Sequence, residues 1–94
     1  MGDKNQLARI TTCDATSKTG HGILKALYVD TPGDIIFRVY DGTDNTGLLL
    51  FEIDTDSATS GHLFAAPYIN HPVNVGIHTD VVSGTTGGLV IVYE

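Results

Sequence analysis

Four histidines and a single cysteine are the side chains of this 94-residue chain best suited to bind a metal or attack a substrate. The histidines are His21, His62, His71 and His78. No pair has the i, i+4 spacing that places two histidines on one face of a zinc-binding helix, and a Cys/His site would need a second cysteine. The pattern therefore predicts surface or interface histidines and no metal site.

The acidic loop Asp41–Gly47 carries oxygen ligands at alternate positions, as calcium loops do. Its acidic spacing is irregular and no helices are expected to flank it, unlike an EF-hand. Turn-forming Asp, Asn and Gly residues explain this loop fully. Asp54 and Asp56 lie in a second acidic loop, where we expect their carboxylates to face solvent and to cap backbone groups. We expect neither loop to hold a metal, and no cofactor is predicted.

For hydrolytic chemistry the sequence offers Ser57 and Ser60 before His62, and Cys13 before His21. Neither combination has a nucleophile-elbow or papain-like context. A β-domain of this size also has little room for a deep substrate pocket. We therefore expect no enzyme and no catalytic residue, with Cys13 as a small buried apolar residue.

Composition excludes several classes of partner. Eleven acidic residues against five basic ones give a formal net charge of −6. This balance argues against nucleic acids, whose binding needs a basic surface, and against anionic membranes. The N-terminus lacks the apolar region of a signal peptide, and no apolar run is long enough to span a bilayer. The expectation is a protein made in a cytoplasm.

The elements that must position these residues are short strands punctuated by eleven glycines and three prolines. No ten-residue segment has the 3.6-residue period of a helix. The sequence predicts a single domain over 1–94, an antiparallel, jelly-roll-like β-sandwich of six to seven short strands with no significant helix. The expected strands are Gln6–Thr12, Gly22–Asp30, Ile35–Asp41, Leu48–Ile53, Gly61–Ala66, Val73–Thr79 and Leu89–Tyr93, and Asp14–Gly20 is expected to be a loop.

Self-association is expected from size and patterning. A chain this short buries a modest core, and it has no disulfide framework to stabilise it. The segment Gly22–Asp30 is largely apolar on both faces. It is therefore either a central strand or a strand covered by another subunit.

Several stretches resemble small virion structural proteins of tailed bacteriophages. They are a strand that ends in Tyr40-Asp41-Gly42-Thr43, the return strand Gly47–Ile53, and a glycine-rich turn before the closing Leu89–Glu94. The similarity covers about Gly22 to Glu94 and carries no catalytic motif. It implies a non-enzymatic decoration (cement) protein that binds the major capsid protein as a homotrimer. The implied location is the capsid surface of the virion, after synthesis in the host cytoplasm.

Two alternatives belong to other classes. One is a tail- or baseplate-associated adhesin or carbohydrate-binding module, with Tyr40 or Tyr68 as exposed aromatic residues, although the chain has no tryptophan. The other is a small hydrolase or metal-binding enzyme that uses His62 and Cys13.

The polar N-terminal arm is the candidate capsid contact, since flexible segments become ordered on binding. A frayed terminus is the simpler interpretation of the same residues. Deletion of residues 1–6 without loss of capsid occupancy would exclude the contact. The arm residues are Gly2, Asp3, Lys4, Asn5 and Gln6.

Overall fold

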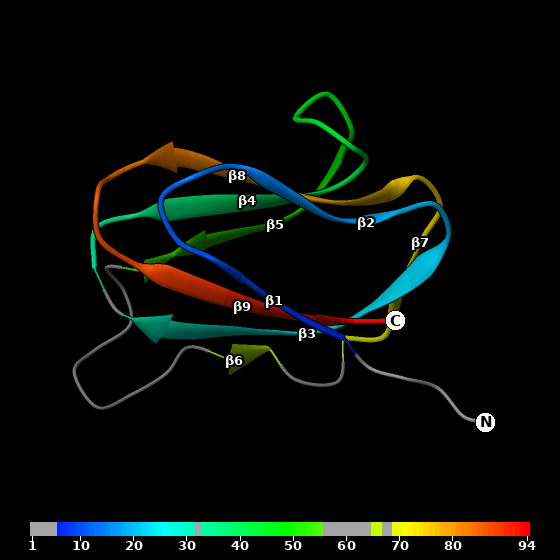
Figure 1. Cartoon of the computed structure of the whole chain (residues 1–94), viewed down its shortest axis with the longest axis horizontal. Coiled ribbons are helices and arrows are strands. Elements are labelled where there is room, and N and C mark those ends of the chain that lie inside the picture. The colour runs from blue at the N-terminus through cyan, green and yellow to red at the C-terminus, as the bar shows by residue number, and fades with distance from the viewer. Residues whose placement is uncertain (1–5, 32, 56–64, 67–68) are drawn as a thin grey trace.

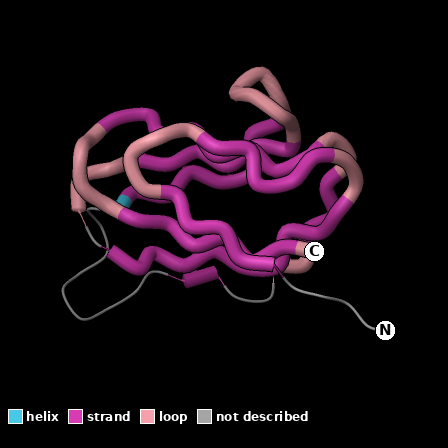
Figure 2. The backbone as a smooth tube through the Cα atoms, in the orientation of Figure 1, coloured by secondary structure: helices cyan, strands magenta, loops and turns pink. Residues whose placement is uncertain are grey.

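The computed structural model describes residues 6–31, 33–55, 65–66 and 69–94, and the regular elements within these ranges are all β-strands. Figure 1 shows them in two layers, and Figure 2 shows how much of the described backbone is strand. Of the N-terminal arm, only Gln6 lies within the described residues. The strands are β1 (Gln6–Ile10), β2 (Ala15–Thr19), β3 (Gly22–Thr31), β4 (Ile36–Asp41), β5 (Leu48–Asp54), β6 (Ala65–Ala66), β7 (His71–Val73), β8 (Gly76–Ser83) and β9 (Gly88–Tyr93).

The strands pair in a nested order. Sheet A runs β1-β9-β3-β6, with β7 also paired to β3, and sheet B runs β2-β8-β4-β5. Thus β1 pairs with β9, β2 with β8, β3 with β6 and β4 with β5, all antiparallel. This order is that of a jelly roll, in which a long hairpin is folded over into two sheets. The predicted fold class is confirmed.

The core lies between the two sheets. Sheet A contributes leucine, isoleucine and valine from β3 and β9, and sheet B contributes Phe37, Val39 and Ile77. In β3, Leu24, Leu27 and Val29 are fully buried, and the strand lies between β9 on one side and β6 and β7 on the other. Of the two explanations for its apolar character, the central strand is therefore the one the structure supports.

Two features differ from the sequence-based prediction. Residues 14–20, expected to be a loop, contain β2, which pairs with β8. This strand is rich in threonine, serine and lysine because it lies at the edge of sheet B, where its side chains are half-buried or exposed. Threonine favours strands, and an edge strand does not need two apolar faces.

The second difference concerns Val73–Thr79, which was expected to be one alternating strand. The chain instead leaves β7 at Val73, turns through Asn74 and Val75, and enters β8 at Gly76. The carboxylate of Asp41 fixes this turn by accepting backbone N–H groups from all three residues of 74–76. Val75 is consequently exposed, whereas His78, expected on the wet face, is buried.

The predicted hairpin between Ile35–Asp41 and Leu48–Ile53 is confirmed as β4 and β5. Its register shifts once, since Val39 pairs with Phe51 whereas Tyr40 pairs with Leu49, and Leu50 is the extra residue of a β-bulge. The loop that joins these two strands projects beyond β8 in Figure 1.

Candidate functional site

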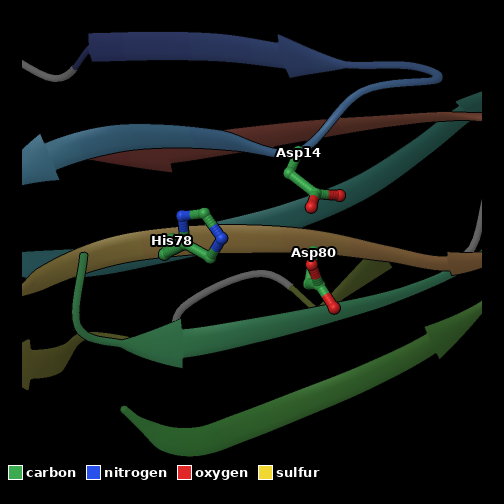
Figure 3. A group of neighbouring side chains, drawn as sticks. All are labelled: Asp14, His78 and Asp80. Carbon is green, nitrogen blue, oxygen red and sulfur yellow. The ribbon is translucent and has the colours of Figure 1, made fainter. Parts of the chain in front are cut away.

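Three side chains with metal-ligating atoms meet on the outer face of sheet B. His78 and Asp80 lie two residues apart on β8 and so share one face, while the intervening Thr79 is fully buried. Asp14 stands in the connection before β2 and faces them, as Figure 3 shows. One ligand atom from each residue lies within 4.8 Å of the others. We call these three residues the Asp–His–Asp cluster.

The ring of His78 is held in a defined orientation. Its Nδ1 lies 2.9 Å from the Thr16 hydroxyl, and that hydroxyl donates to the carbonyl oxygen of Thr43 at 3.1 Å. Because the single hydroxyl proton goes to Thr43, Nδ1 must be the donor to the Thr16 oxygen. In the neutral ring, Nε2 then carries the lone pair, and Figure 3 shows Nε2 pointing to the side on which the two carboxylates lie.

The two carboxylates have opposite electrostatic environments. Asp14 accepts the backbone N–H of Val81 at 2.7 Å, and this hydrogen bond is the largest cause of a lowered pKa for Asp14. Burial raises the pKa of Asp80, and the neighbouring Asp14 raises it further. A side-chain hydrogen bond from Asn45 works the other way on Asp80. The pair therefore carries a like-charge conflict, which a cation between them would relieve.

The acidic loop Asp41–Gly47 takes part in this site, although not as a calcium loop. Its Thr43 carbonyl and Asn45 side chain interact with Thr16 and Asp80. Its own carboxylates have local structural tasks, since Asp44 accepts the backbone N–H of Thr46 and Asp41 caps the 74–76 turn. Burial acts to raise the pKa of Asp41, but the backbone N–H donors outweigh it and the pKa of Asp41 is lowered.

The other side chains singled out from the sequence are dispersed. His21, His71 and Asp54 are exposed, and His71 Nδ1 lies 2.8 Å from the Pro72 carbonyl oxygen. Cys13 is exposed, so its expected burial is wrong, because it lies in the β1–β2 connection rather than on a core-facing position of a strand. Tyr40 is only 8% exposed, which removes it as an exposed aromatic platform. The candidates Asp56, Ser57, Ser60, His62 and Tyr68 lie outside the described residues, as do Gly2–Asn5 of the arm.

Sequence reasoning missed Asp14, Thr16 and Asp80. The one local signal is the His78-Thr79-Asp80 triplet, because alternate residues of a strand point to the same side. Asp14 and Thr16 come from the segment expected to be a loop, and only the pairing of β2 with β8 brings them to His78.

A second surface feature lies at the edge of sheet B. Among the described strands, β5 pairs only with β4, so its other edge is open. Leu48 is 66% exposed and Leu49 47% exposed at the start of this strand. We call Leu48–Leu50 the β5 edge segment. Charged residues, which protect sheet edges, occupy only the far half of β5, at Glu52 and Asp54.

Comparison of the sequence with protein-family models found no matching family, and comparison with curated proteins found no match. Among the described residues, no helix has the length and apolar character needed to cross a membrane.

Proposed function

We propose that this protein is a non-enzymatic assembly module that associates with copies of itself through the open edge of β5. The observation that carries the proposal is the β5 edge segment, which presents two exposed leucines at a strand edge that no other described strand pairs with. Such an edge is a template for pairing with another chain. A β-strand from a second copy would cover the leucines and satisfy the backbone at the same time.

The specific form of this function that we propose is a decoration (cement) protein, a homotrimer bound to the major capsid protein on the outside of a virion head. Its support is the resemblance of the sequence to virion structural proteins, together with a jelly-roll fold of the type used in viral capsids. Fold alone does not determine function, so the capsid role rests on that resemblance. A cement protein has to bind a repeating capsid surface, and it needs no cofactor to do so.

The test of self-association is the molar mass of the purified chain by light scattering over a concentration series. The expected result is a trimer that dissociates when Leu48 and Leu49 are both replaced by lysine, because two charges cannot be buried unpaired in an interface. Leu7→Lys is the matched control, since Leu7 is 71% exposed on β1, at an edge of the other sheet. A wild-type chain that is monomeric at every concentration would contradict the proposal.

The adhesin alternative uses the same fold, because lectins also include jelly rolls. Burial of Tyr40 takes away one of its two candidate aromatic residues, and the other, Tyr68, lies outside the described residues. Glycan binding by the isolated protein would favour this alternative over the capsid role.

A further inference from the structure

The strongest unexplained feature of the molecule is the free nitrogen of His78. The residue is only 9% exposed, and its Nδ1 is occupied by Thr16. No described residue forms a hydrogen bond with Nε2, which points toward Asp14 and Asp80 in Figure 3. The Nε2 lone pair and the two carboxylates therefore lie close together as three possible ligands for one cation placed between them.

The donor set defines the class of cation. One imidazole nitrogen and two carboxylates form a three-ligand N/O site that leaves further positions for water, as in many zinc sites. Ca²⁺ and Mg²⁺ prefer sets made entirely of oxygen ligands, whereas imidazole favours Zn²⁺ and its first-row neighbours.

The geometry is close to what such an ion needs. Ligand atoms around a tetrahedral Zn²⁺ lie about 3.4 Å apart, given bonds of about 2.1 Å. The ligand atoms of the three side chains already lie within 4.8 Å of one another, so they must approach by about 1.4 Å at most. Two of the ligands stand on β8, and the third, Asp14, is exposed in the connection between β1 and β2, where the backbone N–H of Val81 holds its carboxylate.

We propose that Asp14, His78 and Asp80 bind a divalent first-row transition-metal ion, best represented by Zn²⁺, on the outer face of sheet B. Thr16 is the positioning residue, because it receives the Nδ1 proton and so leaves Nε2 free to coordinate. Zinc-binding histidines commonly donate their second N–H to a fixed oxygen acceptor, such as a carboxylate or a backbone carbonyl, and the Thr16 oxygen takes that place here. The sequence alone predicted no metal site, and the proposal departs from that prediction because the ligands come from separate segments.

The bound ion has a structural consequence. It ties the β1–β2 connection, through Asp14, to β8, through His78 and Asp80. An ion that binds only the folded chain stabilises it by mass action. The inference is independent of the self-association proposed above, since it concerns a site within one chain.

The test is calorimetric titration of the full, chelator-treated chain with Zn²⁺, with Ca²⁺ and Mg²⁺ as parallel titrants. We expect one Zn²⁺ per chain, a raised melting temperature, and no comparable binding of Ca²⁺ or Mg²⁺. Asp14→Asn and Asp80→Asn should each weaken the Zn²⁺ affinity more than about 100-fold, and Thr16→Val about 10- to 100-fold. His71→Gln is the matched control, because His71 is an exposed histidine outside the cluster. The Zn²⁺ affinity of this variant should equal that of the wild type.

A second measurement identifies the coordinating atom and does not depend on the variants being folded. In the ¹⁵N spectrum of the wild-type imidazoles, Zn²⁺ should shift Nε2 of His78 while Nδ1 stays protonated. Absence of Zn²⁺ binding, binding that survives both aspartate substitutions, a shift at another histidine instead, or a preference for Ca²⁺ would each overturn the proposal.

Discussion

At the scale of single residues, three aspartates act as loop anchors. Asp41 accepts backbone N–H groups from the 74–76 turn, Asp34 accepts those of Thr85 and Thr86, and Asp14 accepts that of Val81. In each case a side chain from one part of the chain satisfies the backbone of a distant part. Backbone groups in turns have no ladder partner, so Asp41 and Asp34 determine where two turns lie, whereas Asp14 binds a backbone group of β8 beyond the end of its pairing with β2.

Replacement of Asp41 by alanine should lower the free energy of unfolding by about 2 kcal/mol, because it leaves the turn N–H groups without their acceptor. Asp41→Asn should cost less, since the amide oxygen still accepts. Urea denaturation measures both. Glu52→Gln is the control, because its ion pair with Arg38 is exposed and screened by solvent, so its loss should change the free energy of unfolding little. Equal losses for Asp41→Ala and Glu52→Gln would show that the cap is unimportant.

The pH dependence of stability separates Asp80 from the anchoring aspartates. Burial raises the pKa of Asp80, so its contribution to stability is full below the unfolded pKa and declines as the pH rises through the folded pKa. Asp80→Asn should therefore stabilise the metal-free chain at pH 7. This gain should shrink as the pH falls toward the ordinary aspartate pKa of about 3.9. Urea denaturation in a chelator at pH 4 and pH 7 measures the effect.

Asp34 provides the opposite case within the same experiment. Hydrogen bonds from the Thr85 and Thr86 backbone lower the pKa of Asp34. The stability that Asp34 contributes is present above the unfolded pKa and is lost as the pH falls through the folded pKa. Asp34→Asn should therefore destabilise the chain at pH 7 and have less effect at pH 4. The same pH trend in both variants would be incompatible with the opposite pKa shifts.

At the scale of elements, the connection between β8 and β9 depends on a backbone conformation that favours glycine. Gly84 has a φ of +96°, and a Cβ there would overlap the carbonyl oxygen of Asp34. Gly20 has a similar φ of +91°, but a Cβ there would meet no atom within 4 Å. The two glycines are thus a matched pair that differs only in the space around them.

Gly20→Ala should cost about 1 kcal/mol, the penalty for the positive φ alone. Gly84→Ala should cost at least about twice that, because the turn must also move away from Asp34. Thermal denaturation of the two variants side by side is the measurement. A smaller loss for Gly84→Ala than for Gly20→Ala would mean that the turn adjusts without penalty.

The elements also show which patterns a sequence reveals. Strands that direct apolar side chains toward the core at alternate positions, such as β4 and β9, were predictable because burial imposes their alternation. The edge strand β2 has no such stripe, since its pairing with β8 and not its own hydrophobicity makes it a strand. The turn after β7 was hidden because Val73 before it, Val75 within it and Ile77 after it continue the alternation.

At the scale of the whole molecule, nested pairing explains why the Asp–His–Asp cluster could not be read from the sequence. The pairing of β2 with β8 joins segments far apart in the chain, and the β4–β5 loop then adds Thr43 and Asn45 beside them. Each of these residues is of a type that is ordinary in its own turn or strand, and only the topology of the sheet brings them together.

The same topology places four residues in one row across sheet B, namely Thr16, His78, Tyr40 and Leu49. The cluster and the β5 edge segment therefore lie on the same sheet, two strands apart.

The position of β9 also sets the order of events when the chain is made. In sheet A this strand lies between β1 and β3, with Leu7 opposite Val92 and Leu27 opposite Ile91. Until residues 88–93 have left the ribosome, β1 has no neighbour among the described strands and β3 lacks its longest described partner. Residues 6–10 therefore remain without this partner while residues 11–87 are translated, and sheet A is completed only once β9 has been made.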